Sequence, residues 1–146
     1  MIIEGAGPEK QVILGWILKF IKPEERDIII ELGCNNGWYI GNLLGQNNPK
    51  RVLTLGVDLD ITALVAGRKK YSIPYFLCSD IQHLPLKNES ISKLICTETL
   101  EHVPDDRTAA KELSRVLKKG GKAFITIPNK NARWGWRFKE FDHKVG

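Results

Sequence analysis

The chain has 146 residues, enough for one domain with a sizeable core, and its 42% hydrophobic and 27% charged residues are ordinary for a globular protein. No apolar run approaches the ~18 residues of a membrane span, and the first ten residues lack a secretory signal, so we expect a cytoplasmic protein. Three cysteines without Cys-x-x-Cys spacing argue against a disulfide framework or a structural zinc site, and we assign no metal-binding residue.

The hydrophobic pattern predicts an alternation of helices and strands. Apolar residues at helical spacing indicate a helix over 9–22 that ends before Pro23. In chain order we then expect a strand at 27–33, a helix at 38–44, a strand at 52–57, a helix at 61–71, strands at 75–78 and 91–97, a helix at 107–117 stopped by Gly120 and Gly121, and a strand at 122–127. The alternation predicts parallel β-α-β units, and the short apolar strands fit a sheet covered by helices on both faces.

The last residues are basic and aromatic. Trp134, Phe138 and Phe141 share one face of a helix by their spacing, so we expect a final helix that docks on the sheet. The alternative is a surface that stacks bases or a flat substrate. With no linker visible, we expect one domain over 1–146, made of an N-terminal helix region (1–26), a core (27–129) and this C-terminal segment (130–146).

Charge is unevenly distributed along the chain. Residues 1–106 carry 11 Lys and Arg against 14 Asp and Glu, a balance of −3, whereas residues 107–146 carry 11 against 3, a balance of +8. The basic third invites an anionic partner such as nucleic acid, although a solvated helix face explains it more simply.

The segment 28–37 (Ile-Ile-Ile-Glu-Leu-Gly-Cys-Asn-Asn-Gly) joins an apolar strand to a helix through a glycine-bearing turn. This layout places a small ligand at the carboxyl edge of a parallel sheet, beside backbone N–H groups. Glycine at positions 33 and 37 removes side chains that would keep a ligand off the backbone.

Four acidic residues stand at or just past the ends of four successive strands: Glu31, Asp58, Asp80 and Glu98. Converging carboxylates are costly without a ligand to bind. A nucleoside supplies a reason, because Asp58 can accept both ribose hydroxyls, and Asp80 can take an exocyclic amine. A nicotinamide dinucleotide fits less well, since the turn is G-x-x-x-G and Glu31 would repel a pyrophosphate.

Five segments together resemble the motifs of class I S-adenosylmethionine-dependent methyltransferases, of the methyltransferase type 11 kind. They are ELGCNNG (31–37), GVDLD (56–60), CSDIQHLPL (78–86), TETLEHVPD (97–105) and RVLKKGGKAFITIPN (115–129), in order and at the family's spacing. Asn35 stands where the family usually has glycine, and asparagine tolerates positive φ better than other residues.

The resemblance implies a three-layer α-β-α Rossmann-like, doubly wound sheet with five mostly parallel strands in the order 3-2-1-4-5, and S-adenosylmethionine as the cofactor. It implies that the glycine turn wraps the methionine part and the sugar, that Asp58 holds the ribose, and that Asp80 holds the adenine amine. The cofactor-binding set it implies is Glu31, Leu32, Gly33, Cys34, Asn35, Gly37, Asp58, Leu59, Asp80, Ile81 and Thr97.

The family adds two strands after strand five, and we find no room for them, so strand five is expected to be an unprotected edge. Either the chain is truncated after strand five, or the last helix or another chain, as in a homodimer, covers this edge. Through the LEHV segment, the resemblance implies transfer of a methyl group to a small-molecule acceptor. Alternatives are a nucleic-acid (RNA) methyltransferase and a non-catalytic cofactor-binding subunit. No catalytic residue is assigned: His102 is interpreted as structural, with a general base as the alternative.

Overall fold

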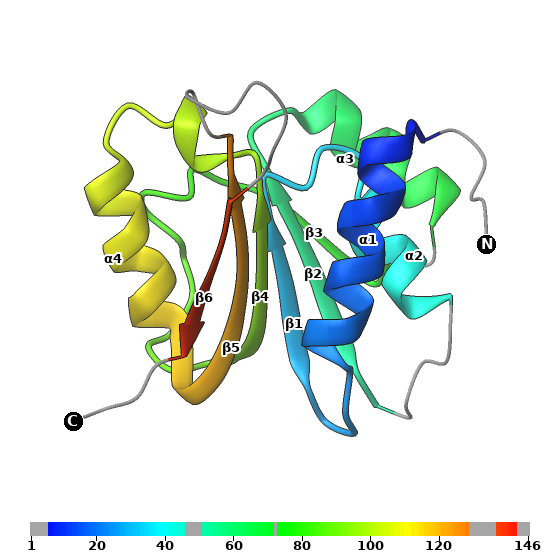
Figure 1. Cartoon of the computed structure of the whole chain (residues 1–146). Helices are drawn as coiled ribbons and strands as arrows, with labels where there is room; N and C mark the ends of the chain where they lie inside the picture. Colours follow the sequence, from blue (N-terminus) through cyan, green and yellow to red (C-terminus); the bar gives the residue numbers. More distant parts are fainter. Residues whose placement is uncertain (1–5, 46–50, 72, 129–136, 143–146) are drawn as a thin grey trace.

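The computed structural model describes residues 6–45, 51–71, 73–128 and 137–142 as one sheet with helices on both faces (Figure 1). Its elements are α1 (Pro8–Ile21), β1 (Ile28–Leu32), α2 (Trp38–Leu44), β2 (Leu53–Asp58), α3 (Ile61–Lys70), β3 (Tyr75–Cys78), β4 (Ile91–Thr97), the 3₁₀ turn η1 (Leu100–His102), α4 (Asp106–Val116), β5 (Leu117–Ile127) and β6 (Arg137–Asp142).

The strands are ordered β3-β2-β1-β4-β5-β6, and the first five are parallel. This confirms the expected order 3-2-1-4-5. Because the chain order reverses at β1, the loops that follow β1 and β4 diverge at the carboxyl edge, where ligands of open α/β sheets bind.

Two apolar clusters, one on each face, hold the helices to the sheet. Helices α1, α2 and α3 cover one face and α4 covers the other (Figure 1). Ile13, Ile17 and Ile40 pack with Ile95 on the first face, whereas Leu113 and Val116 of α4 pack with Leu94 on the second. Successive side chains of β4 point alternately into the two clusters, so both of its faces are buried. This explains why its sequence is almost continuously apolar.

The predicted helices and strands up to residue 116 are confirmed to within one or two residues, and β3 and β4 have the expected bounds. The expected stop of the fourth helix at Gly120 and Gly121 is wrong. Helix α4 ends at Val116, and Leu117 already pairs with Ile91 of β4. The glycines instead belong to an irregularity in β5, where Gly120 has a φ of 73° and the register shifts before Lys122 pairs with Lys93.

The prediction of a final helix is also wrong where it can be compared. Residues 137–142 form β6, which runs antiparallel to β5 with Lys122 opposite Asp142 and Ile127 opposite Arg137. Strand five is therefore not an open edge, which removes the reason for a homodimer there. Trp134 lies outside the described residues. Within the described residues, no helix has the length and apolar character needed to cross a membrane.

A buried ion pair anchors the amino end of the sheet. Lys93 of β4 is 5% exposed and lies 2.5 Å from Asp27, and its ammonium donates to the carbonyl of Lys22 at the end of α1. Burial by itself would raise the pKa of Asp27, but the hydrogen bonds from Lys93 and from the amide of Glu24 outweigh it and hold the pKa below its usual value. The pair therefore ties the α1–β1 connection to β4.

Replacing Lys93 with Met should destabilise the protein by about 3 kcal/mol, because it leaves the Asp27 carboxylate buried without its partner. Chemical denaturation measures the effect. Adding Asp27→Asn to Lys93→Met should restore part of the loss, and Glu24→Gln is the matched control, since Glu24 is 73% exposed and 3.5 Å from the same ammonium. A double variant no more stable than Lys93→Met would contradict this reading.

Candidate functional site

The glycine turn between β1 and α2 lies at the carboxyl edge of the sheet. Gly33 and Gly37 have φ values of 68° and 71°, and Asn35 also has a positive φ, of 50°. The amide of Gly37 donates to the carbonyl of Cys34 at 2.7 Å, and the amide of Cys34 donates to Val57 of β2 at 3.0 Å. The turn therefore keeps its conformation with asparagine at position 35, as the sequence predicts.

Asp58, the last residue of β2, holds this turn in place. One of its carboxylate oxygens accepts from the amide of Asn35 at 2.7 Å, and the other accepts from the amide of Asp60 at 2.9 Å. Asp60 in turn caps α3 by accepting from the amides of Thr62 and Ala63. Each oxygen of Asp58 has a second acceptor position, and the residue is partly exposed. The carboxylate can therefore accept two further donors from a ligand.

Thr99 supports the turn from the side of β4. A Cβ added to Gly33 would overlap the Thr99 side chain, whose hydroxyl donates to the carbonyl of Thr97 at 2.9 Å. Thr99 is not among the site residues predicted from the sequence, although it lies in the TETLEHVPD segment. Position 33 therefore requires glycine for two reasons: its positive φ and the close approach of Thr99.

Glu31 lies beneath the turn. It is 1% exposed, and its carboxyl accepts from the amide of Ile40 in α2 at 2.9 Å. Burial raises the pKa of Glu31 to about 8, and the nearby charge of Asp58 adds to this, while the hydrogen bond from Ile40 opposes it. Glu31 thus supports α2 from a buried position, and its contact with a ligand stays a prediction.

The loop after β3 places Asp80 and Ile81 at the same edge. Asp80 is partly exposed, and Gln82 donates to it from its side chain at 2.9 Å and from its backbone amide at 2.9 Å. These hydrogen bonds from Gln82 lower the pKa of Asp80, so the carboxylate is charged at neutral pH. Ile81 is buried at 6% exposure, while Leu59 at the end of β2 is 69% exposed. An apolar ring could thus lie against Leu59 with its polar edge toward Asp80.

Residues after β4 form the other side of the edge. Thr97 is buried at 8% exposure, and Glu98 has a φ of 50°, a strained value for glutamate. Burial raises the pKa of Glu98, and the charges of Glu101 and Glu9 add to the effect. The His102 ring is largely exposed and lies 4.0 Å from Glu101. Across the described part of the chain, no group of three His, Cys, Asp or Glu side chains could hold a metal ion.

Most of the predicted site residues lie together at the carboxyl edge, whereas Glu31 is buried beneath it. At the edge, Asn35 of the turn is hydrogen-bonded to Asp58, and Thr99 connects the turn to Thr97. Asp80 and Ile81 lie on the loop after β3, which neighbours β2. Gln82 and Thr99 are the contacts that the sequence interpretation missed.

The Methyltransferase domain family matches residues 30–125, a range that contains every predicted site residue. The chain therefore belongs to the class I S-adenosylmethionine-dependent methyltransferase family, whose cofactor is S-adenosylmethionine.

Two curated relatives and one solved structure illustrate the range of the family. A tRNA U34 carboxymethyltransferase of Nautilia profundicola is 31% identical over 115 residues, which are 72% of this chain and 36% of that protein. A ubiquinone biosynthesis O-methyltransferase of Coxiella burnetii is 30% identical over 109 residues, 70% of this chain and 44% of that protein. The crystal structure of a SAM-dependent methyltransferase from Aquifex aeolicus superposes with a TM-score of 0.72 at 17% identity, covering 87% of this chain and 71% of that one. The chain thus spans less than half the length of these two curated relatives.

The described residues fit the cofactor's chemistry. Asp58 has free acceptor positions for a diol, the turn has no side chain at 33 or 37, and Asp80 is a charged acceptor beside an apolar surface made by Leu59. Within residues 6–45, 51–71 and 73–128, no positively charged side chain donates a hydrogen bond to the carboxylate of Asp58 or Asp80. The edge therefore suits a cationic nucleoside better than a phosphorylated one.

Glu31→Gln should change how stability depends on pH. Since Glu31 has a raised pKa in the folded protein, the native state binds more protons than the unfolded state between its ordinary pKa of 4.5 and about 8, so wild-type stability should fall as pH rises across this window. The slope from this group is at most about 1.4 kcal/mol per pH unit. Urea denaturation from pH 5 to 8.5 should show the free energy of unfolding of Glu31→Gln rising relative to that of the wild type. Parallel curves of unfolding free energy against pH would contradict the raised pKa.

Proposed function

We propose that this protein transfers a methyl group from S-adenosylmethionine to a small-molecule acceptor. The bound sulfonium supplies an electrophilic methyl group and a good leaving group, so the protein contributes mainly by positioning the two reactants. This agrees with a site built of backbone amides and carboxylates, in which we assign no catalytic acid or base.

The observation that carries the proposal is the link between Asp58 and the amide of Asn35 at 2.7 Å. It brings the glycine turn and the end of β2 into one unit with acceptor positions facing outward. In this unit Asp58 would hold the ribose hydroxyls, Leu59 would lie beside the adenine, and Asp80 would accept its amine. The turn from Gly33 to Gly37 would wrap the methionine part and the sugar.

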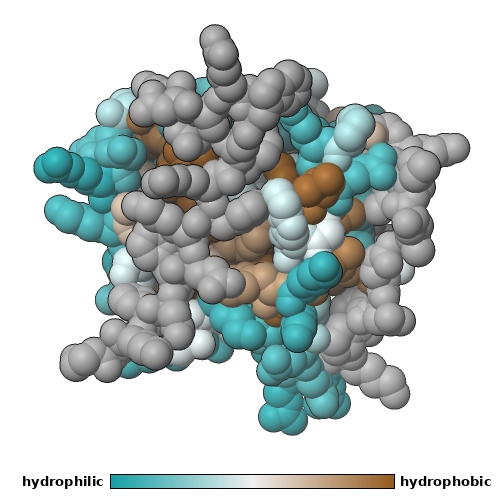
Figure 2. All heavy atoms as spheres, viewed as in Figure 1, coloured by the Kyte–Doolittle hydropathy of each residue, from teal (hydrophilic) through white to brown (hydrophobic). Residues whose placement is uncertain are grey.

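Separation of charge supports a small acceptor. Asp58, Asp80 and Glu98 lie at the carboxyl edge, where an acceptor must approach the methyl group, and these carboxylates would repel a polyanion. The exposed lysines 118, 119 and 122 lie at the amino end of β5 instead. Figure 2, viewed as in Figure 1, shows hydrophilic residues at the lower end of the molecule and also on its left side and at its upper right. Five residues of strand separate Lys122 from Ile127, a length of about 17 Å.

The relatives keep a second acceptor class open. The 30% identical Coxiella protein is named for ubiquinone biosynthesis, which agrees with a small acceptor, whereas the 31% identical Nautilia protein is named for tRNA. The balance of +8 over residues 107–146 favours RNA as the second candidate.

Replacing Asp58 with Ala should abolish detectable binding of S-adenosylhomocysteine, because it removes the ribose acceptor and releases the amide of Asn35. Isothermal calorimetry measures the binding, and circular dichroism checks that the fold is kept. Asp106→Ala on the exposed first turn of α4 is the control and should bind as the wild type does. An unchanged dissociation constant for Asp58→Ala would refute the ribose assignment.

Reversing the charges of lysines 118, 119 and 122 to glutamate should leave cofactor binding unchanged, because these residues lie at the opposite edge from the turn. If RNA is the acceptor, the binding constant of the wild type for RNA should fall steeply as the salt concentration rises. In the triple variant, the slope of log binding constant against log salt concentration should be smaller by the amount expected for about three lost phosphate contacts. Filter binding over a range of salt concentrations distinguishes the candidates. Wild-type binding that is weak and insensitive to the triple variant would leave the small acceptor as the proposal.

A further inference from the structure

The loop between β3 and β4, residues 79–90, carries Asp80 and Ile81 yet contains no helix or strand of its own. Its first turn is held by local hydrogen bonds, from the amide of His83 to the carbonyl of Asp80 at 3.1 Å and from Gln82 to the Asp80 carboxylate. Ile81 and Leu84 point into the apolar cluster of α4. The position of Asp80 therefore depends on how this loop is attached to α4.

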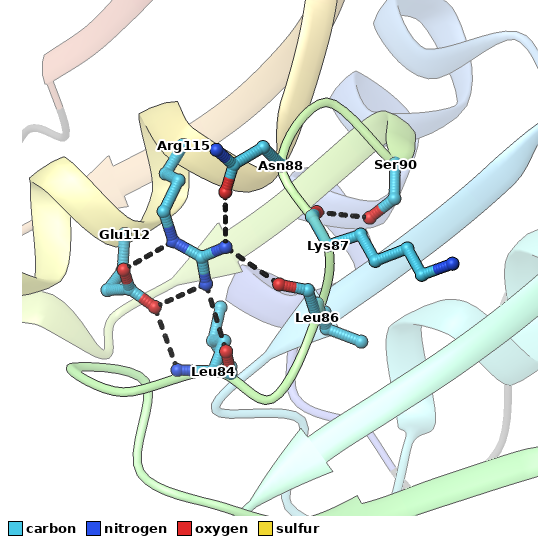
Figure 3. Close-up of polar contacts among 7 residues, drawn as sticks. All are labelled: Leu84, Leu86, Lys87, Asn88, Ser90, Glu112 and Arg115. Carbon is cyan, nitrogen blue, oxygen red and sulfur yellow. Dashed lines mark hydrogen bonds and ion pairs between the residues drawn. The ribbon is translucent and has the colours of Figure 1, made fainter.

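Arg115, in the last turn of α4, makes most of the polar attachment (Figure 3). Its guanidinium lies between Glu112 and the loop and uses all five of its N–H donors. Two of them bind the Glu112 carboxylate, at 2.6 and 2.7 Å. The other three bind the carbonyl of Leu84 at 2.9 Å, the carbonyl of Leu86 at 2.7 Å and the side-chain oxygen of Asn88 at 2.8 Å.

Glu112 completes the attachment from the same helix. The carboxylate oxygen that receives one donor of Arg115 also accepts from the amide of Leu84 at 2.9 Å. The hydrogen bond from Arg115 is the largest influence on Glu112 and lowers its pKa, so the pair stays ionised at neutral pH. At the other end of α4, Gln82 accepts from the amide of Asp105. The loop is thus held at both ends of one helix, and the fork geometry at Arg115 cannot be made by lysine.

We propose that Arg115 is a positioning residue for adenine recognition: by holding residues 84–88 against α4, it fixes Asp80 at the place where the exocyclic amine is read. The inference rests on the proposed function, because it assumes that Asp80 faces adenine. It assigns a role in nucleobase specificity to a side chain that lies outside the site and whose hydrogen bonds to other described residues go to the loop and to Glu112.

The test compares S-adenosylhomocysteine with S-inosylhomocysteine, whose base has a carbonyl oxygen in place of the amine. By calorimetry on the full chain, the wild type should bind the adenosyl compound at least tenfold more tightly, since Asp80 accepts from the amine but repels the carbonyl. Arg115→Lys should weaken binding of the adenosyl compound at least fivefold and that of the inosyl compound less than twofold, so that the ratio between them falls. A role in stability alone would weaken both equally and leave the ratio unchanged.

Lys111→Gln is the matched control, because it removes a cation from the exposed side of the same helix and should keep the wild-type ratio. Glu112→Gln and Asn88→Ala remove fewer contacts and should lower the ratio less, which keeps the test valid if Arg115→Lys folds poorly. An unchanged ratio in all folded variants overturns the inference. A wild type that binds both compounds equally also overturns it but leaves the proposed function standing, whereas a wild type that binds neither refutes the proposed function and the inference with it.

Discussion

Parallel pairing of β1 with β2 is the constraint on which the site depends. It sets Leu32 opposite Val57, so that the chain leaving β1 passes directly over the end of β2. Cys34 and Asn35 can then donate to Val57 and Asp58, and two strands separated by a helix share one rigid edge. The positive φ values of the turn are tolerated because these hydrogen bonds hold it against the end of β2, while Thr99 packs against Gly33 from the side of β4.

Local sequence patterns were sufficient to predict most of this arrangement. The short apolar runs of β1 and β4, the glycines of the turn and the acid at the end of β2 are all signals within a few residues, and the structure has them where the sequence placed them. Asn35 is a further case, since its tolerance of positive φ is a property of the residue itself.

Features that depend on distant partners were not predicted. The spacing of Trp134, Phe138 and Phe141 suits a helix, but residues 137–142 pair with β5, whose edge would otherwise lack hydrogen-bond partners. Arg115 contacts Leu84, which is 31 positions away in the sequence, and Leu86, which is 29 positions away. No short motif indicates these contacts. The sequence predicts Glu31 at the exposed carboxyl end of the strands. Its burial under α2 follows from the face of β1 on which it lies, where it meets the backbone amide of Ile40.

Charge is arranged along the strand direction as well as along the sequence. The carboxylates of Asp58, Asp80 and Glu98 lie where the parallel strands end, and the exposed lysines of β5 lie where that strand begins. Acidic side chains also lie at the amino end, where Glu24 is close to Lys93 and Glu89 is close to Lys119, so the charges there are of both signs. The carboxylates beside the glycine turn favour a cationic ligand over a polyanion. The overall charge of +5 therefore describes neither edge.

The direct junction between α4 and β5 has a consequence for the order of assembly. Val116 ends the helix and Leu117 begins the strand, while the amides of Glu89 and Ser90 already bind the carbonyls of Arg115 and Val116. Strand pairing within each half of the sheet joins residues 20 to 29 positions apart, in β1–β2, β2–β3 and β4–β5, whereas β1 and β4 pair across 64 positions. Because loop-closure entropy grows with sequence separation, each half is suited to form before the pairing of β1 with β4 joins them.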